Sequence, residues 1–520
     1  MSDLPPISLL APLALLAVAS LGFVRSGRRP ANLPRLAEAA ALAALGFAGM
    51  GVAQLLLFGP SRLSFGDGAA LISFRLDAVA TTMTLLVAFI GWVVTRYART
   101  YIDGETQEGA CHGLMLATLA AVLTLVQAAS LTALIPAFVA IGLGLYRLLR
   151  FYSERPEARR AAAKFALIWG AGDTALVSAA VLLWISAGTT DFDTINSAAG
   201  AGLTPAAQVA VGLLVLTALL KTAAFPLHGW LTEVMEAPTP ISALLHAGII
   251  NAGGFLLIRF ADLVQANPGA MATLVFMGGL TALFGAVVML TQSAVKTALA
   301  WSTIAQMGFM LLQCGLGLWP LALLHIVAHS LYKAHAFLAA GTAVKAVNAI
   351  RKPGPVAAPG LTAVTKSFAL AVMLYVIVAW GFGMVAGSKS AQALALGAIV
   401  IFGVAYLVAQ GLADAAPLAL TQRTAAASLV TAVAYFAFHL GADALWGPHL
   451  PEVPNPGALE WALIVLAVVT FGLVAVAQAL FPHWAHHPAA AGLRVHLANG
   501  LYLNALLDRM IGGFRTPKSL

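Results

Sequence analysis

The sequence predicts an all-α, polytopic transmembrane protein, and three observations support that fold class. Of the 520 residues, 61% are hydrophobic and only 9% are charged, and the mean hydropathy is +0.91. Apolar runs of about twenty residues, each long enough to cross a bilayer as a helix, recur along the whole chain. The runs are continuous blocks without strand-like alternation, which excludes a transmembrane β-barrel.

The apolar runs predict about fifteen spans. The expected limits are 6–25, 36–58, 76–97, 111–129, 131–149, 162–187, 207–226, 241–262, 271–290, 296–316, 320–345, 366–386, 391–411, 424–440 and 458–481. The first run has no basic residue before it and no small-residue cleavage site, so we expect a retained helix and not a secretory signal.

Basic residues predict the orientation of the chain. With fifteen spans and the N-terminus outside, the basic clusters all fall on the cytoplasmic side, as the positive-inside rule requires. The clusters are Arg25, Arg28, Arg29 and Arg35; Arg96 and Arg99; Arg147, Arg150, Arg155, Arg159, Arg160 and Lys164; and Lys345, Arg351, Lys352 and Lys366. We therefore expect a multi-pass protein of a bacterial inner (plasma) membrane with a cytoplasmic C-terminus. The net charge of +8 then reflects topology and not nucleic-acid binding.

The two cysteines indicate no site. Cys111 and Cys314 lie in separate apolar segments, which is typical of small buried hydrophobic residues and predicts neither a disulfide nor a metal site.

A polar stretch interrupts the seventh apolar segment. Lys221 closes that segment, and Pro226 soon afterwards removes a backbone donor and breaks the helix. Pro238 and Pro240 restart the chain as the eighth helix, with Thr239 as the expected cap. Broken helices at membrane depth are tolerated where they line protein or a hydrated cavity.

The side chains of this stretch predict a hydrated path. Besides Lys221, the stretch carries His228, Glu233, Glu236 and His246. Ionisable groups within a membrane are costly and usually functional. Glu233 and Glu236 have a second interpretation as ordinary interfacial carboxylates, which the sequence leaves open.

The eleventh apolar segment carries a row of ionisable residues. His325, His329 and Lys333 are spaced at i, i+4 and i+8, so they share one helix face over about 12 Å. Histidine titrates near neutrality, and groups at this spacing can pass a proton directly or through a water. The alternatives are histidines bonded to backbone carbonyls, or a metal site, although no carboxylate or cysteine lies nearby in sequence. His335 lies off this face and is expected to pack.

Two further groups extend this set. Asp173 is the one acidic residue inside the sixth span. Lys296 begins the tenth span, and Lys164 lies near the cytoplasmic end of the sixth; each lysine is either part of the path or a topology anchor at the interface. A weak internal likeness also relates KTAAF at Lys221 to KAHAF at Lys333, which suggests equivalent elements of two repeats.

Three ordered motifs resemble a known family. They are KTAAFPLHGWLTEVMEAPTPISALLHA, KTALAWSTIAQMGFM and HIVAHSLYKAHAFLAAG, and together they resemble the proton-translocating antiporter-like family of complex I subunit 5 and Mrp-type subunits. The resemblance implies two inverted five-helix repeats with broken helices. The implied division is 1–110 N-terminal helices, 111–411 antiporter-like core (repeats about 111–262 and 271–411), 412–481 C-terminal helices and 482–520 cytoplasmic amphipathic tail.

The resemblance also implies roles for particular residues. Lys221 and Lys333 match the paired lysines, Lys296 the bridging lysine, and Asp173 the acidic residue of the sixth helix. His246, His325 and His329 match the polar axis at the bilayer centre.

One departure concerns the partner of the first lysine. Complex I relatives supply it from the fifth helix in a Trp-Glu-Gly pattern, but Phe138 and Val139 occupy those positions here. The partner of Lys221 is therefore missing or replaced, with Asp173 and Glu233 as the candidate replacements. Gly170 also stands where the family has an arginine. Both departures argue against a full pumping cycle and are compatible with a passive, partner-gated cation path.

Within the family, the chain resembles the DabB branch, the membrane subunits of two-component inorganic carbon accumulation systems. RYARTYIDGE at 96–105 and LRVHLANGLYLNALLDRMIG at 493–512 support this branch. It implies a subunit that translocates a cation, with the proton as the expected ion. This subunit would energise the conversion of CO2 to bicarbonate by DabA, a zinc carbonic-anhydrase-like partner on the cytoplasmic face. No cofactor is expected in this chain, since the zinc belongs to the partner.

The tail and the rival functions complete the expectations. LRVHLANGLYLNALLDRMIGG has apolar residues at helical spacing, which favours partner docking over lying along the membrane. HWAHH at 483–487 is expected at the membrane interface. The rivals are a complex I-like subunit, an Mrp-type proton/sodium antiporter subunit, and a structural anchor for a cytoplasmic enzyme.

Overall fold

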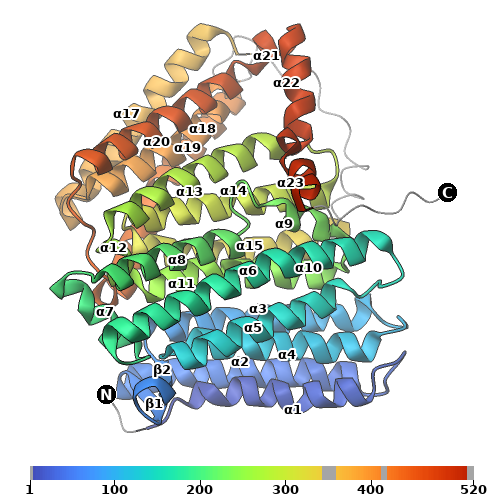
Figure 1. Ribbon diagram of the computed structural model, residues 1–520. Helices are drawn as coiled ribbons and strands as arrows, with labels where there is room; N and C mark the ends of the chain where they lie inside the picture. Colours follow the sequence, from blue (N-terminus) through green and yellow to red (C-terminus); the bar gives the residue numbers. More distant parts are fainter. Residues whose placement is uncertain (1–3, 342–358, 412–417, 512–520) are drawn as a thin grey trace.

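The computed structural model describes residues 4–341, 359–411 and 418–511 (Figure 1). Within these residues, twelve helical segments are long and apolar enough to cross a membrane. The shorter α8 (Pro205–Lys221) and α18 (Ala391–Gly411), together with α14 (Val295–Gly315), bring the crossing segments to the expected fifteen. The predicted all-α membrane class is confirmed, whereas the division into four segments of chain stays a prediction.

The crossing helices lie side by side in a long row, which begins at α1 and ends at α17 (Figure 1). The first part of the row contains α1 (Leu10–Val24), α2 (Leu33–Phe58), α3 (Ala78–Tyr101), α4 (Glu108–Gln127), α5 (Leu131–Leu149) and α6 (Pro156–Ala187). The middle part contains α8 (Pro205–Lys221), α10 (Thr239–Ala247), α11 (Ala252–Arg259), α13 (Pro268–Met289), α14 (Val295–Gly315) and α15 (Trp319–Leu338). The last part contains α17 (Leu361–Ala386), α18 (Ala391–Gly411), α19 (Leu418–Trp446) and α20 (Ala458–Ala479).

Short elements lie on the two opposite faces of this row, where the crossing helices begin and end (Figure 1). One of them, here called the hairpin face, carries β1 (Ser61–Phe65), β2 (Ile72–Leu76), α7 (Phe192–Ser197) and α12 (Ala261–Gln265). The other, the tail face, carries α9 (Gly229–Glu233), α21 (Phe481–Trp484), α22 (Pro488–Ala498) and α23 (Leu503–Ile511). The antiparallel β1–β2 hairpin pairs Ser61 with Leu76 and Phe65 with Ile72, and the span pattern had not predicted it.

The predicted helix break after Lys221 is confirmed. α8 ends at Lys221, Ala223 has a φ of +53°, and the Phe225–Pro226 peptide is cis before α9 begins. The expected cap of the next helix is wrong: Pro238 holds the N-cap position, and the Thr239 hydroxyl instead donates to the Tyr101 hydroxyl at 3.2 Å. A second interruption, which the sequence did not indicate, separates α10 from α11 at Ile249–Asn251.

The two lysine motifs do not share a local structure. α8 ends at Lys221, whereas α15 runs without a break past Lys333 to Leu338. The two motifs therefore differ in local structure, and the equivalence of the two segments within a pair of repeats stays a prediction. Cys111 and Cys314 are both buried and free, as expected.

Glycines bring α1 and α4 into backbone contact. A Cβ at Gly22 would lie 2.5 Å from the Gly113 Cα, and one at Gly113 would lie 3.0 Å from the Ala19 carbonyl oxygen. Association of helices in lipid depends on such close packing, because no hydrophobic gain drives it.

Gly22→Ala is expected to destabilise the protein, because the added methyl group meets backbone atoms of α4 that cannot move independently. The cost of such overpacking is about 1–3 kcal/mol. A lower melting temperature in detergent checks this. Gly49→Ala in α2 is the matched control, since no atom lies within 4 Å of its added Cβ, and its melting temperature is expected to stay level or rise slightly.

Candidate functional site

Lys221 and Asp173 form an ion pair between α8 and α6. The Lys221 Nζ lies 2.6 Å from the Asp173 Oδ1, and the lysine side chain is 0% exposed. Because an unpaired buried charge is costly, this carboxylate is what allows a lysine at this position. Of the two expected replacements for the missing glutamate, the structure selects Asp173.

Aromatic rings enclose the ammonium group of Lys221. Its Nζ lies 4.0 Å from the ring centroid of Trp169 and 4.8 Å from that of Phe138. Both rings present their faces at a distance typical of cation–π contacts. Phe138 is fully buried beside the lysine, whereas the neighbouring Val139 is 37% exposed.

A second group of polar side chains gathers where α10, α14 and α15 meet. The His246 Nδ1 lies 3.1 Å from the Thr303 hydroxyl, and the His329 Nε2 lies 3.2 Å from the His246 carbonyl oxygen. His246 also stacks on Phe337, with 4.4 Å between the ring centroids. The interruption between α10 and α11 begins three residues beyond His246, and the Asn251 amide in it donates to the Ser330 hydroxyl at 3.0 Å.

The row predicted on α15 does point into the protein. Lys333 is fully buried, and its Nζ donates to the Leu299 carbonyl at 2.9 Å. His325 and His329 follow along the helix, with ring centroids 6.0 Å apart. His335 lies off this face, as predicted, but it is exposed and does not pack.

Lys296 lies at the beginning of α14 and is partly exposed. Its Nζ donates to the Ala237 carbonyl in the connection before α10, at 3.4 Å. This contact ties α14 to the broken segment and places Lys296 at the edge of the second group.

A third group, here called the tail-face charge cluster, consists of Arg160, Lys164, Glu233, Asn504 and Asp508. The Lys164 Nζ lies 2.6 Å from the Glu233 Oε1 and 2.5 Å from the Asp508 Oδ1. Arg160 contacts the same two carboxylates. Glu233 is therefore a partner of α6 at the tail face, and it does not pair with Lys221.

The remaining candidates lie outside these groups. His228 is buried among the rings of Phe225, Phe284 and Trp301, with a ring-centroid distance of 5.0 Å to Trp301. Glu236 is largely exposed and pairs with Arg155 at 3.2 Å, which agrees with the interfacial interpretation.

The structure thus divides the predicted path into three groups. Among the described residues, no direct hydrogen bond joins the Lys221–Asp173 pair to the His246 group. Thr303, Ser330, Asn251, Asn504 and Asp508 were not predicted as members. A threonine or serine in an apolar helix carries no sequence signal of its own, whereas Asn251, an amide side chain inside the apolar eighth segment, offered a weak one.

No metal site is formed by three or more histidine, cysteine or acidic side chains within the part of the chain that the structure describes.

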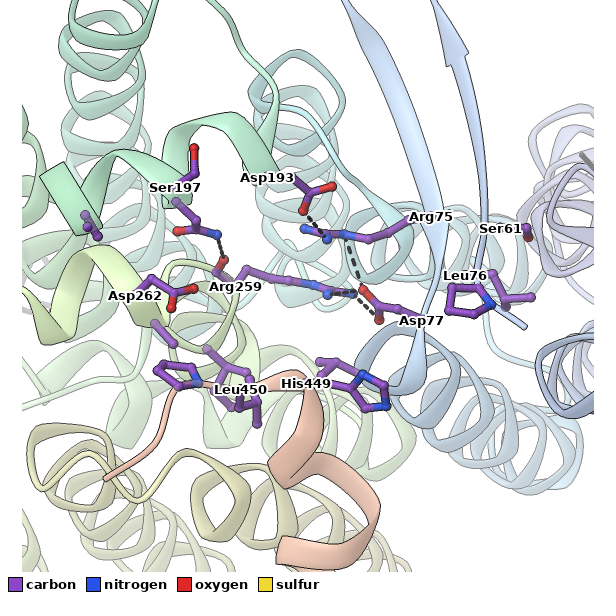
Figure 2. Close-up of a pocket in the computed structure, with 18 residues that line it drawn as sticks. Ser61, Arg75, Leu76, Asp77, Asp193, Ser197, Arg259, Asp262, His449 and Leu450 are labelled. Atoms are coloured by element: carbon purple, nitrogen blue, oxygen red, sulfur yellow. Dashed lines mark hydrogen bonds and ion pairs between the residues drawn. The ribbon is translucent and has the colours of Figure 1, made fainter. Parts of the chain in front are cut away.

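A cavity of about 560 Å³ opens at the hairpin face. Figure 2 shows the Arg259 side chain reaching to Asp77, with Arg75 between Asp77 and Asp193. Arg62 of β1 also pairs with Asp191 and Asp193. The acidic loop at 189–200 is therefore neutralised by arginines of the hairpin, and these charges tie the loop to the crossing helices.

Asp77 anchors this network. Burial raises the pKa of Asp77, but the charges of Arg259 and Arg75, with hydrogen bonds from Arg259 and the Ala80 N–H, outweigh it and lower the pKa from 3.8 to about 2. Two nitrogens of the Arg259 guanidinium reach the carboxylate, at 2.7 and 3.3 Å.

Comparison with known families agrees with this architecture. Residues 128–412 match the model of the family described as "NADH:quinone oxidoreductase/Mrp antiporter, TM", and residues 63–109 match "NADH-Ubiquinone oxidoreductase (complex I), chain 5 N-terminus". The chain belongs to the NADH:quinone oxidoreductase/Mrp antiporter family, as the three motifs predicted.

Individual relatives add detail to the family assignment. The probable inorganic carbon transporter subunit DabB2 of Halothiobacillus neapolitanus is 34% identical over 471 residues, which cover 89% of this chain and 84% of the relative. The probable inorganic carbon transporter subunit DabB of Hydrogenovibrio crunogenus is 45% identical over 51% of this chain and 52% of the relative. NADH-quinone oxidoreductase subunit L of Mycobacterium tuberculosis is 30% identical over 85% of this chain and 71% of the relative.

Solved structures share the fold. The Mrp complex from Dietzia sp. DQ12-45-1b aligns with a TM-score of 0.64 and 25% identity over 97% of this chain and 59% of that chain. The archaeal membrane-bound sulfane sulfur reductase aligns with a TM-score of 0.57 and 16% identity over 96% of this chain and 98% of that chain, a likeness of fold alone.

Asp77→Asn is expected to lower stability at neutral pH by about 3 kcal/mol, because it leaves the buried Arg259 without its counter-charge. Asparagine can still cap the N-terminus of α3 as Asp77 does, so the loss of stability measures the effect of removing the charge. Melting temperatures in detergent measure it. Asp193→Asn, whose side chain is 54% exposed, is the control and is expected to change little.

The ion pair between Asp77 and Arg259 also predicts that stability depends on pH. A carboxyl group with a lowered pKa stabilises the fold above its unfolded-state pKa and loses that contribution as the pH falls. The difference in melting temperature between the wild type and Asp77→Asn is therefore expected to shrink as the pH falls from 3.8 towards about 2. A difference that stays constant over this range would contradict the assignment.

Proposed function

We propose that the chain is the cation-translocating subunit, with the proton as its ion, of an inorganic carbon (CO2 to bicarbonate) accumulation complex. The observation that supports this most directly is the fully buried Lys221, paired with Asp173 where α8 breaks. A purely structural anchor has no need of a buried ion pair next to a broken helix, and intramembrane ionisable residues usually mark ion pathways.

The pair suggests how a proton is held and released. Buried lysine keeps its proton while Asp173 lies close, because their attraction offsets the loss of hydration. Movement of α6 against α8 lengthens the contact and leaves the ammonium group without a counter-charge, so the proton leaves. The His246, His329 and Lys333 group takes up the proton through side chains and ordered water, since no direct hydrogen bond joins the two groups in the described residues.

The named relatives and the basic residues support a proposal for the partner and for the orientation in the membrane. Relatives named as inorganic carbon transporter subunits imply a partner, for which we propose a zinc carbonic-anhydrase-like subunit like DabA. The basic residues favour the tail face as the cytoplasmic side of a bacterial inner membrane and the hairpin face as the outer side. The partner then binds at the tail face and holds the zinc, while this chain carries no cofactor.

An Mrp-type antiporter subunit is the second candidate. The alignment with the Dietzia Mrp complex over 97% of this chain favours it. Restored sodium tolerance in an antiporter-deficient host, without restored growth in air, would select this candidate. Isolation of the chain with a zinc protein of carbonic anhydrase type would select the first.

Lys221→Ala and Lys333→Ala are each expected to abolish growth in air of a carbonic-anhydrase-deficient bacterium that depends on this chain and its partner. Each substitution removes a buried proton-carrying group from the path. His335→Ala is the matched control, because His335 is exposed on the helix that carries Lys333, and full growth is expected. Undiminished growth of both lysine variants, at equal protein levels, would rule out the proposed path.

Asp173→Asn is expected to stop proton uptake into vesicles that contain the complex, because the neutral amide cannot balance the Lys221 charge. Asp173→Glu keeps the charge and is expected to retain part of the uptake. A pH-sensitive dye inside the vesicles measures the rates. Equal uptake by Asp173→Asn and the wild type would show that Asp173 only packs against Lys221.

A further inference from the structure

The tail folds back onto the chain itself. α22 and α23 lie on the tail face, and α23 lies close to α9 (Figure 1). The sequence had favoured docking of this segment on a partner. That expectation stays a prediction, and the structure shows in addition that polar residues of this segment contact α6, which carries Asp173, and α9, which follows the break after Lys221.

Two residues of α23 make these contacts. Asn504 and Asp508 are one helical turn apart and share a face. Asp508 contacts Lys164 at 2.5 Å and Arg160 at 2.7 Å, both on α6. Asn504 accepts a hydrogen bond from Lys164 at 2.8 Å and donates one to Glu233 at the end of α9. One helix therefore bridges α6 and α9.

Steric contacts seat the tail at the same place. A Cβ at Gly229, the first residue of α9, would lie 2.0 Å from the Asn504 Oδ1. At the turn before α23, a Cβ at Gly500 would lie 3.2 Å from the Trp301 ring. A glycine at 229 is what allows the asparagine side chain to reach Lys164 and Glu233.

α23 is held at the rim of the protein by a narrow strip of contacts. Its inner face carries Asn504 and Asp508 together with the half-buried Leu503 and Leu507, and Leu503 packs against the core. The outer side is open, since Leu506 is 50% exposed and Met510 is 82% exposed. None of the side chains from Leu503 to Met510 is fully buried, and segments with few buried apolar contacts open at low free-energy cost.

These contacts lie on the elements that position the proton-binding pair. Lys164 and Asp173 are on the same helix, α6, and Glu233 closely follows the break after Lys221. Any shift of α6 against α8 and α9 that separates Lys221 from Asp173 also pulls on the bridge made by Asn504 and Asp508.

We propose that α23 is a clamp that fastens α6 to α9, holds the Lys221–Asp173 pair closed, and must be released before the path conducts. Asp508 is the positioning residue of this clamp and acts through Lys164 and Arg160. The proposal rests on the proposed proton path and adds its control. The exposed Leu506 and Met510 leave the outer side of α23 accessible while the clamp is closed.

Proton flux through the purified full-length chain in vesicles tests the clamp. Asp508→Asn removes the charge that both Lys164 and Arg160 contact, and the weakening of these two partly exposed ion pairs corresponds to about a tenfold shift in the population of the released state. The flux is expected to rise by up to that factor, and the Asp508→Asn/Lys221→Ala double variant is expected to show none of the increase. Asp508→Glu is expected to restore the wild-type rate, and Arg509→Gln, on the exposed side of α23, is the control.

Gly229→Ala is expected to favour the released state of α23 without a change of charge, because the added methyl group displaces the Asn504 amide. We expect it to raise the flux in the same direction as Asp508→Asn. Hydrogen exchange of the amides of α23 gives a second readout, and both variants are expected to exchange faster there than the Arg509→Gln control.

Unchanged or lower flux in both Asp508→Asn and Gly229→Ala, with faster exchange in α23, would overturn the clamp, as would exchange that does not change. These outcomes leave the proposed function standing if Lys221→Ala still abolishes growth in air. Full growth of the Lys221→Ala and Lys333→Ala strains would instead refute the proton path itself.

Discussion

The contact between Lys221 and Asp173 is the interaction on which the rest of the proposed machinery depends. A lysine that is completely enclosed by protein needs a counter-charge, because removing its hydration costs several kcal/mol. The need for that carboxylate fixes how α6 lies against α8. Because of the break, α8 ends at Lys221 itself, and the chain does not continue as a helix beyond the charged residue.

In the proposed path, Asp173 of α6 supplies the counter-charge that the resemblance to complex I subunits places on the fifth helix. Phe138 and Trp169 enclose the ammonium group, and the carboxylate comes from α6. Since α6 also carries Lys164 at the tail face, one helix links the buried pair to the surface charges. The proposed clamp therefore acts on the buried lysine through α6 itself, the helix that carries both Lys164 and Asp173.

The charged side chains at the hairpin face and at the tail face have different structural roles. At the hairpin face, Arg62, Arg75 and Arg259 neutralise the acidic loop and Asp77, and the result is a network that ties loops to helices. At the tail face, Lys164 and Arg160 are shared between Glu233 and a carboxylate from the last helix. The first network joins neighbours that stay together, whereas the second joins the transmembrane helices to a segment held at the rim.

The sequence by itself determined the all-α class, the crossing segments, the break after Lys221 and the face shared by His325, His329 and Lys333, because hydropathy, proline and helical periodicity act locally along the chain. Only the tertiary structure decided that Asp173 and not Glu233 pairs with Lys221, that Thr303 joins His246, and that Asp508 reaches Lys164. Those partners lie between 48 and 344 positions apart, and packing of helices, which no local pattern encodes, sets which of them meet.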